Sequence, residues 1–293
     1  MGARVFRLLP WILLQPYAVV AQPSVAKFKE LLSAPSAIEQ ISAERRYSAS
    51  SKPTDYYFGR WQSNGFVLSV STNAQNVDRG GPVGSLTQAF GRYDDLLWQV
   101  YGANRPLKIG TVRSLGSKSE LPVSSYWASV DLGRLLNFGI DHLRPGEVNW
   151  IGNTYLNTNH SHNVVVSGEV GTNVSGQVTH ATMNISILSE SPFSPGEVVR
   201  RHRWELEYQY NRSISDTYPA VIKRYVLRQQ DRFLRDEIHI HSLKLATGVM
   251  QPALFAYDPY VLPDSWILRG TNNTFYYTAA DGTARPVPTA SSP

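Results

Sequence analysis

The stretch that decides the fold is DYYFGRWQSNGFVLSVS, residues 55–71. It is rich in Tyr, Phe, Trp and Val, which favour strands. Asn64-Gly65 in its middle is typical of a tight hairpin turn. These features predict two antiparallel strands. Residues 94–113 predict a second hairpin, and the polar, Gly-rich residues 73–84 between the two predict a loop.

The second half of the chain also has the residue pattern that is typical of strands. Along DEIHIHSLKLA, residues 236–246, Ile238 and Ile240 alternate with His239 and His241, which is the period of a strand. Strands separated by polar turns are predicted over residues 148–156, 162–170, 177–188, 199–210, 219–227 and 232–246. The simplest arrangement is one curved antiparallel sheet of eight or more strands with a few helices, an α+β fold.

Two segments predict helices. In residues 24–48, Val25, Phe28, Leu31 and Leu32 share one helical face. After Pro35 the apolar spacing resumes, so we expect two short helices or one kinked helix. Residues 127–143 predict another helix, which Pro145-Gly146 ends.

The N-terminus indicates export. Residues 1–21 place Arg4 and Arg7 before an apolar run that ends in small residues at Ala21, the order of a signal peptide. We expect one domain over residues 22–281 and a disordered tail over residues 282–293, which is rich in Pro, Ala, Ser and Thr. There is no cysteine, so the core must be stable without disulfides. This favours a periplasm or cell envelope, while several Asn-x-Ser/Thr sequences keep a secreted protein open.

The charge pattern argues against nucleic acid. The net charge is +5, and the basic residues between positions 200 and 235 alternate with acidic ones. Such mixing is typical of a solvated face with ion pairs, whereas nucleic-acid binding needs a stripe of one sign. Weak, transient attraction to anionic lipid headgroups is compatible with it.

The sequence carries no nucleophile motif, so we expect no enzyme and no cofactor. Two histidine pairs, His160 with His162 and His239 with His241, have the i, i+2 spacing that places two imidazoles on one face of a strand. Glu237 lies on the same face as the second pair, and this leaves a metal-dependent hydrolase as an alternative. Our expectation is that no metal binds.

Three segments resemble the periplasmic lipoprotein carriers, the LolA/LolB-like and LppX-like half-barrels. They are LLSAPSAIEQI followed by RRY, then DYYFGRWQSNGFVLSVS, and then TYPAVIKRYVLRQQDRFLRDEIHIHSLKLA. The resemblance implies a half-barrel whose helices cover the concave face and enclose an apolar cavity for lipid or lipoprotein acyl chains. It implies a monomer without covalent chemistry. A second alternative is an envelope interaction or structural protein with the same fold and a filled core.

The resemblance also suggests site residues. The side chains expected to line the cavity are Tyr57, Trp61, Phe66, Leu68, Trp98 and Val100. In the carriers an arginine on the early strands ties down the helical lid. Arg45, Arg46 and Arg60 lie in that region, and we take Arg60 as the lid contact.

Overall fold

The computed structural model describes residues 23–32, 37–48, 54–62, 65–71, 86–93, 96–101, 108–114, 138–140, 148–159, 164–191, 193, 195–228, 231–256, 266–269, 274–278 and 283–286. Two helical elements are described, the α-helix α1 (Pro23–Leu32) and the 3-10 helix η3 (Pro252–Phe255). The strands are β1 (Ala37–Tyr47), β2 (Asp55–Gln62), β3 (Gly65–Ser71), β4 (Leu86–Tyr93), β5 (Leu96–Tyr101), β6 (Lys108–Ser114), β7 (Val148–Ile151), β8 (Thr154–Asn159), β9 (Val164–Thr172), β10 (Val178–Leu188), β11 (Val198–Gln209), β12 (Val221–Arg228), β13 (Asp231–Leu245), β14 (Trp266–Arg269), β15 (Phe275–Thr278) and β16 (Ala284–Pro286).

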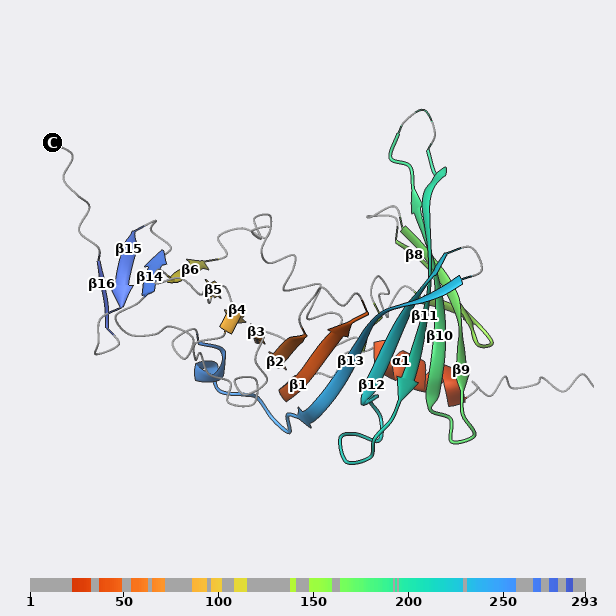
Figure 1. The fold of residues 1–293 in the computed structure, drawn as a ribbon, viewed down its shortest axis with the longest axis horizontal. Coiled ribbons are helices and arrows are strands. Elements are labelled where there is room, and N and C mark those ends of the chain that lie inside the picture. The colour runs from red at the N-terminus through yellow and green to blue at the C-terminus, as the bar shows by residue number, and fades with distance from the viewer. Residues whose placement is uncertain are drawn as a thin grey trace, which may run out of the picture.

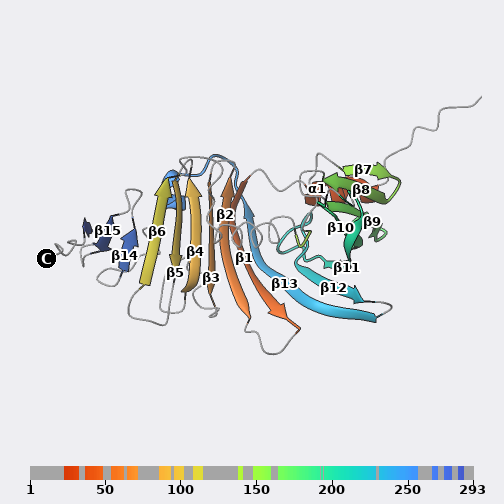
Figure 2. The ribbon, with the colours of Figure 1, turned by 90° about the horizontal axis from the view of Figure 1, so that it is seen from above.

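All of these strands belong to one sheet, in the order β16-β15-β14-β6-β5-β4-β3-β2-β1-β13-β12-β11-β10-β9-β8-β7 (Figures 1 and 2). Neighbouring strands are antiparallel, except that β14 runs parallel to β6. Pairing of β1 with β13 joins the N-terminal meander to the C-terminal one. The predicted fold class, a single curved antiparallel sheet, is therefore confirmed.

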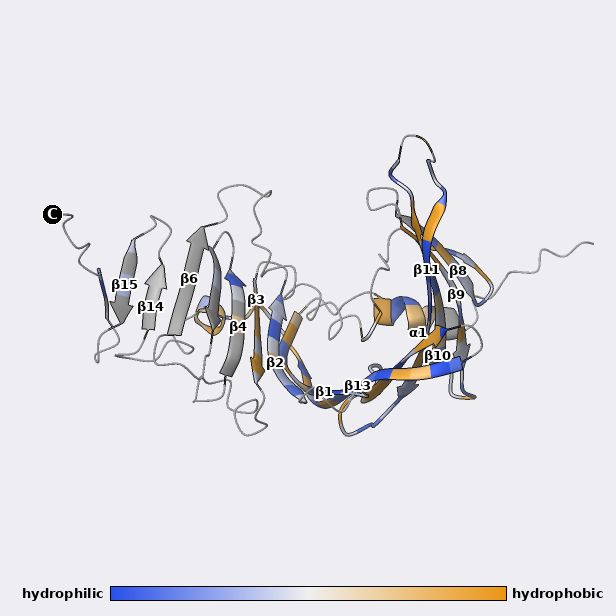
Figure 3. Ribbon diagram, turned by 45° about the horizontal axis from the view of Figure 1, so that its top comes forward, coloured by the Kyte–Doolittle hydropathy of each residue, from blue (hydrophilic) through white to orange (hydrophobic). Residues whose placement is uncertain are grey.

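The sheet bends around β1 and β13, so the strands on either side rise as two walls (Figure 3). Helix α1 lies inside this bend against β9 and β10. We call the face that carries α1 the concave face and the opposite one the convex face. A covering helix on the concave face agrees with the expected half-barrel.

Helix α1 is held by aromatic packing. Phe28 is fully buried, and its ring lies 5.7 Å from those of both Trp150 and Tyr155. Leu31 and Leu32 are buried beside it, as their shared helical face predicts. The core continues across the concave face of the sheet to Ile41 of β1 and Leu68 of β3.

The expectation of a second helical piece after Pro35 is wrong, because residues 37–47 form strand β1. Ile38 and Ile41 are both buried although they are three residues apart. The pairings of β1 with β13 and with β2 are both irregular between these two residues. A bulge of this kind places residues with helix-like spacing on the same face of a strand.

Other predictions meet the structure only in part. In residues 127–143 the structure describes residues 138–140, which form a turn with Phe138 at φ 50° rather than the predicted helix. Strand β16 lies within the predicted disordered tail. Strands β4, β14 and β15 were not anticipated. The predicted signal peptide and His160 and His162 lie outside the described residues, and the domain boundaries stay a prediction.

Candidate ligand-binding face

Four of the predicted site residues come together on the concave face of β2 and β3. Trp61 pairs with Phe66, Gly59 pairs with Leu68, and Tyr57 pairs with Val70. Directly opposite residues of antiparallel strands point to the same face. Tyr57 and Leu68 are buried in the core, whereas Trp61 and Phe66 are partly buried at its border. The rings of these two are stacked with their centroids 6.2 Å apart.

The register places Trp98 on the convex face instead. Gly91 of β4 pairs with both Val67 and Trp98, one residue out of step with the concave row. The Trp98 indole lies over Gly91, where an added Cβ would be 2.0 Å from the ring. Its Nε1–H donates a 2.8 Å hydrogen bond to the Phe255 carbonyl of η3. Val100 pairs with Ala89, two positions along from Trp98.

Arg60 also belongs to the convex side of this wall, since it pairs with Val67. Its guanidinium lies 5.0 Å from the Phe58 ring centroid, and Nη1 is 3.5 Å from the Leu254 carbonyl. Nearby, Gln62 accepts a 3.0 Å hydrogen bond from the Met250 amide. Arg60 therefore contacts a covering segment, but that segment is η3 on the convex face.

At one end of the concave face, a buried charge cluster joins three strands. Asp236 of β13 accepts hydrogen bonds from Arg45 of β1 at 2.6 and 3.1 Å. Arg224 of β12 contacts both Asp236 oxygens at 2.6 Å. Arg224 and Asp236 are fully buried, and Arg45 is 4% exposed. The geometry is that of strong, bidentate charge-assisted bonds.

The cluster shifts the acidities of its members. Burial raises the pKa of Asp236, but the hydrogen bonds and charge of Arg224 and Arg45 outweigh it and lower that pKa to about 2. Burial lowers the pKa of Arg45, and the charge of Asp236 more than reverses this. Beside them, burial raises the pKa of Tyr47 to about 12. Asp236 and Arg45 therefore stay charged at every physiological pH.

Sequence reasoning missed this cluster, because it read the charges between positions 200 and 235 as a solvated face. That interpretation holds for Arg232, which pairs with Glu205 and Glu207 at 2.7 and 2.6 Å. It is wrong for Arg224, which follows the buried Ile222 at the strand period. Asp236 likewise shares a row with Ile238. Opposite charges within two apolar rows were the signal that could have revealed the cluster.

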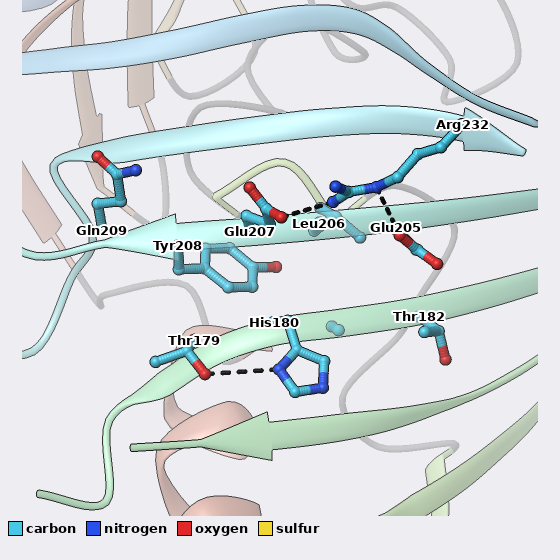
Figure 4. A pocket seen from close by; sticks show the side chains of 10 residues that line it. Thr179, His180, Thr182, Glu205, Leu206, Glu207, Tyr208, Gln209 and Arg232 are labelled. Carbon is cyan, nitrogen blue, oxygen red and sulfur yellow. Dashed lines mark hydrogen bonds and ion pairs between the residues drawn. The ribbon is translucent and has the colours of Figure 1, made fainter. Parts of the chain in front are cut away.

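The convex face of β10 and β11 carries an open pocket of about 620 Å³ (Figure 4). Its lining includes His180, Thr182, Glu205, Glu207 and Arg232. The hydrogen bond from Arg232 lowers the pKa of Glu207. The guanidinium of Arg232 is thus neutralised inside the pocket by the two glutamates. This polar lining offers little to an acyl chain.

The second histidine pair lies on the convex face with Glu237, as predicted. Nε2 of His239 is 3.1 Å from Glu237, while Nε2 of His241 is 3.7 Å from Glu44 of β1. The two imidazoles therefore contact different carboxylates. Within the described ranges, no group of three or more His, Asp or Glu side chains is placed to hold a metal ion. None of the described helices has the length and apolarity needed to span a membrane.

No protein-family model and no curated protein sequence matches the chain. Among solved structures, a LolA superfamily protein from Nitrosomonas europaea matches with a TM-score of 0.36 and 14% identity, over 82% of this chain and 99% of its own. A putative outer membrane lipoprotein-sorting protein domain from Vibrio parahaemolyticus matches with a TM-score of 0.33 and 11% identity, over 80% of this chain and 95% of its own.

Each of the two similarities covers at least 80% of this chain.

Proposed function

We propose that this protein is an exported, non-enzymatic carrier that binds an apolar ligand, a lipid or the acyl chains of a lipoprotein, against the concave face of its sheet. The observation that carries the proposal is the Trp61–Phe66 pair. These stacked aromatic rings are only partly buried and border a continuous apolar core. Each methylene that such a surface removes from water contributes about 0.8 kcal/mol, so a few acyl chains suffice for binding that remains reversible.

The concave face has an apolar middle and a charged end, an arrangement that suits such a ligand. Its middle is apolar, with Ile41, Tyr57 and Leu68 in the core. Its charged end, at Arg45 and Asp236, is closed by internal ion pairs. Nothing in this arrangement activates a nucleophile, and the role proposed needs no cofactor or metal. A carrier of this kind works as a monomer in the periplasm and meets the membrane surface transiently.

A second candidate is an envelope interaction protein with a filled core. The packing of α1 favours it, because Phe28, Leu31 and Leu32 are at most 3% exposed. In that case the wall beneath α1 is occupied by the protein itself. The carrier binds its apolar ligand at Trp61 and Phe66, whereas the filled-core protein binds no such ligand there.

Uptake of a fluorescent fatty-acid probe by the protein tests the proposal. The carrier predicts saturable uptake by the wild-type protein and weaker uptake by Trp61→Ala and Phe66→Ala. Trp98→Phe is the matched control, because Trp98 lies on the convex face and bonds to η3. No uptake by a folded wild-type protein, or equal loss in all three variants, favours the filled-core protein.

A further inference from the structure

The hairpin of β10 and β11 extends beyond the neighbouring strand. The ladder between β11 and β12 begins at Arg203, so the first five residues of β11, 198–202, have no partner on the β12 side among the described residues. Figure 1 shows this hairpin projecting past the rest of the sheet. On the other side of β10, pairing with β9 continues as far as Ile187, which lies opposite Arg200, so only the tip beyond this point is two-stranded.

Three exposed apolar side chains lie at the far end of the hairpin. Phe193 in its turn is 94% exposed, and Val199 on the β11 arm is 61% exposed. Val198, which pairs with Leu188, is 37% exposed. Exposed apolar side chains that are grouped in one place are typical of interaction sites.

Directly behind the tip stand three exposed arginines, Arg200, Arg201 and Arg203. Arg200 pairs with Ile187 and Arg201 with Ser186, so successive arginines point to opposite faces of the sheet just behind the tip. None of the three makes a side-chain ion pair with any residue that the structure describes, unlike Arg224 and Arg232. Glu190 and Glu197 flank the turn. Together with the three arginines they give this end of the hairpin a net charge of +1.

We propose that the β10–β11 hairpin is a membrane-docking element that inserts Phe193 into an anionic lipid surface while Arg200, Arg201 and Arg203 contact the headgroups. Arginines on both faces of the sheet behind the tip suit an end-on approach to a surface of headgroups. A basic residue near an anionic surface strengthens binding about fivefold. Aromatic side chains favour the headgroup level of a bilayer.

A protein partner fits this tip less well. A stable protein interface buries roughly 800 Å² on each partner, which calls for a broad surface. The tip of the hairpin offers a narrow edge with one aromatic ring. The inference extends the transient membrane contact of the proposed carrier, but it does not depend on an apolar ligand being bound.

Co-sedimentation of the full chain with lipid vesicles tests the inference. We expect binding to vesicles of phosphatidylglycerol and phosphatidylcholine that weakens with added salt, and at least tenfold weaker binding to phosphatidylcholine alone. The triple variant Arg200→Gln, Arg201→Gln, Arg203→Gln is expected to lose about tenfold or more in affinity for the anionic vesicles. Phe193→Ser is expected to weaken binding severalfold and to leave its salt dependence in place.

Matched controls lie at the opposite end of the same strands. Val174 in the β9–β10 turn is fully exposed, and the Arg212 side chain after β11 is 92% exposed. Val174→Ser and Arg212→Gln are expected to bind vesicles like the wild type. Equal losses in these controls, or no preference of the wild type for anionic vesicles, would overturn the proposal. Uptake of the fatty-acid probe, measured on the same variants, reports separately on the carrier function.

Discussion

Arg45 and Asp236 are 191 residues apart in the chain, yet Arg45 Nη2 lies 2.6 Å from Asp236 Oδ2. The bond crosses from β1 to β13, the two strands at which the halves of the sheet meet. Arg224 of β12 completes the cluster from the other side. Buried ion pairs stabilise only when both charges are satisfied. The cluster thus fixes the relative position of the strands at the bend of the sheet.

Asp236→Asn is expected to lower the free energy of unfolding by about 3 to 5 kcal/mol, because it leaves two buried arginines without their counter-charge. Urea denaturation measures the change. Asp231→Asn, at the exposed start of the same strand, is the control and is expected to change little. A loss no larger than that of the control would show that the cluster does not hold the strands.

Acid should remove the same stabilisation. The folded pKa of Asp236 is about 2, below its ordinary value of 3.8. A carboxyl with a depressed folded pKa stabilises fully above the unfolded pKa and loses this effect as the pH falls through the folded pKa. The difference in unfolding free energy between the wild type and Asp236→Asn should therefore be constant above about pH 5 and shrink between about pH 4 and pH 2. A difference that stays constant down to pH 2 would contradict the assigned pKa.

Gly91→Ala is expected to displace the Trp98 indole, because the new Cβ would be 2.0 Å from its ring. The hydrogen bond from Trp98 to Phe255 should break, and η3 should detach from β4 and β5. A lower Tm and a red-shifted tryptophan emission are the expected readouts. Gly248→Ala is the control, since its Cβ would meet nothing within 4 Å. Equal melting temperatures for the two variants would show that the indole accommodates the methyl group.

Phe28→Ala is expected to cost about 3 to 5 kcal/mol of unfolding free energy, the usual range for a fully buried aromatic side chain. The loss arises from the contacts with Trp150 and Tyr155. Compared with the wild type, amide hydrogen exchange in this variant should be accelerated more in α1 than in β1. Lys27→Ala, on the solvated side of the helix, should leave exchange unchanged. Unchanged exchange in Phe28→Ala would mean that α1 is held elsewhere.

Much of the second meander could be predicted from the sequence, because apolar and polar residues alternate along most of its strands, although bulges interrupt the alternation in places. Ile238 and Ile240 of β13 are buried, whereas His241 of the same strand is exposed. The same alternation places Asp236 and Glu237 on opposite faces of β13. Strand β1 could not be predicted from the sequence, because a bulge gives its buried residues Ile38 and Ile41 the spacing of a helix.

The composition of the site could be predicted only in part, because faces depend on register across several strands. Tyr57, Trp61, Phe66 and Leu68 lie within one hairpin, so their shared face follows from the local turn. The face of Trp98 depends on β4, which carries too weak a pattern to be recognised from its residues. The Arg45–Asp236 contact spans most of the chain and has no local signal.

Native mass spectrometry of the protein, purified without detergent from the cells that produce it and followed by organic extraction, tests the central claim most directly. The carrier predicts a protein mass increased by that of a lipid or acylated peptide, which extraction removes and identifies. Trp61→Ala should carry less of that mass than Trp98→Phe does. A bare polypeptide mass in every sample, with no uptake of the fatty-acid probe, would contradict the carrier and leave the interaction protein with a filled core.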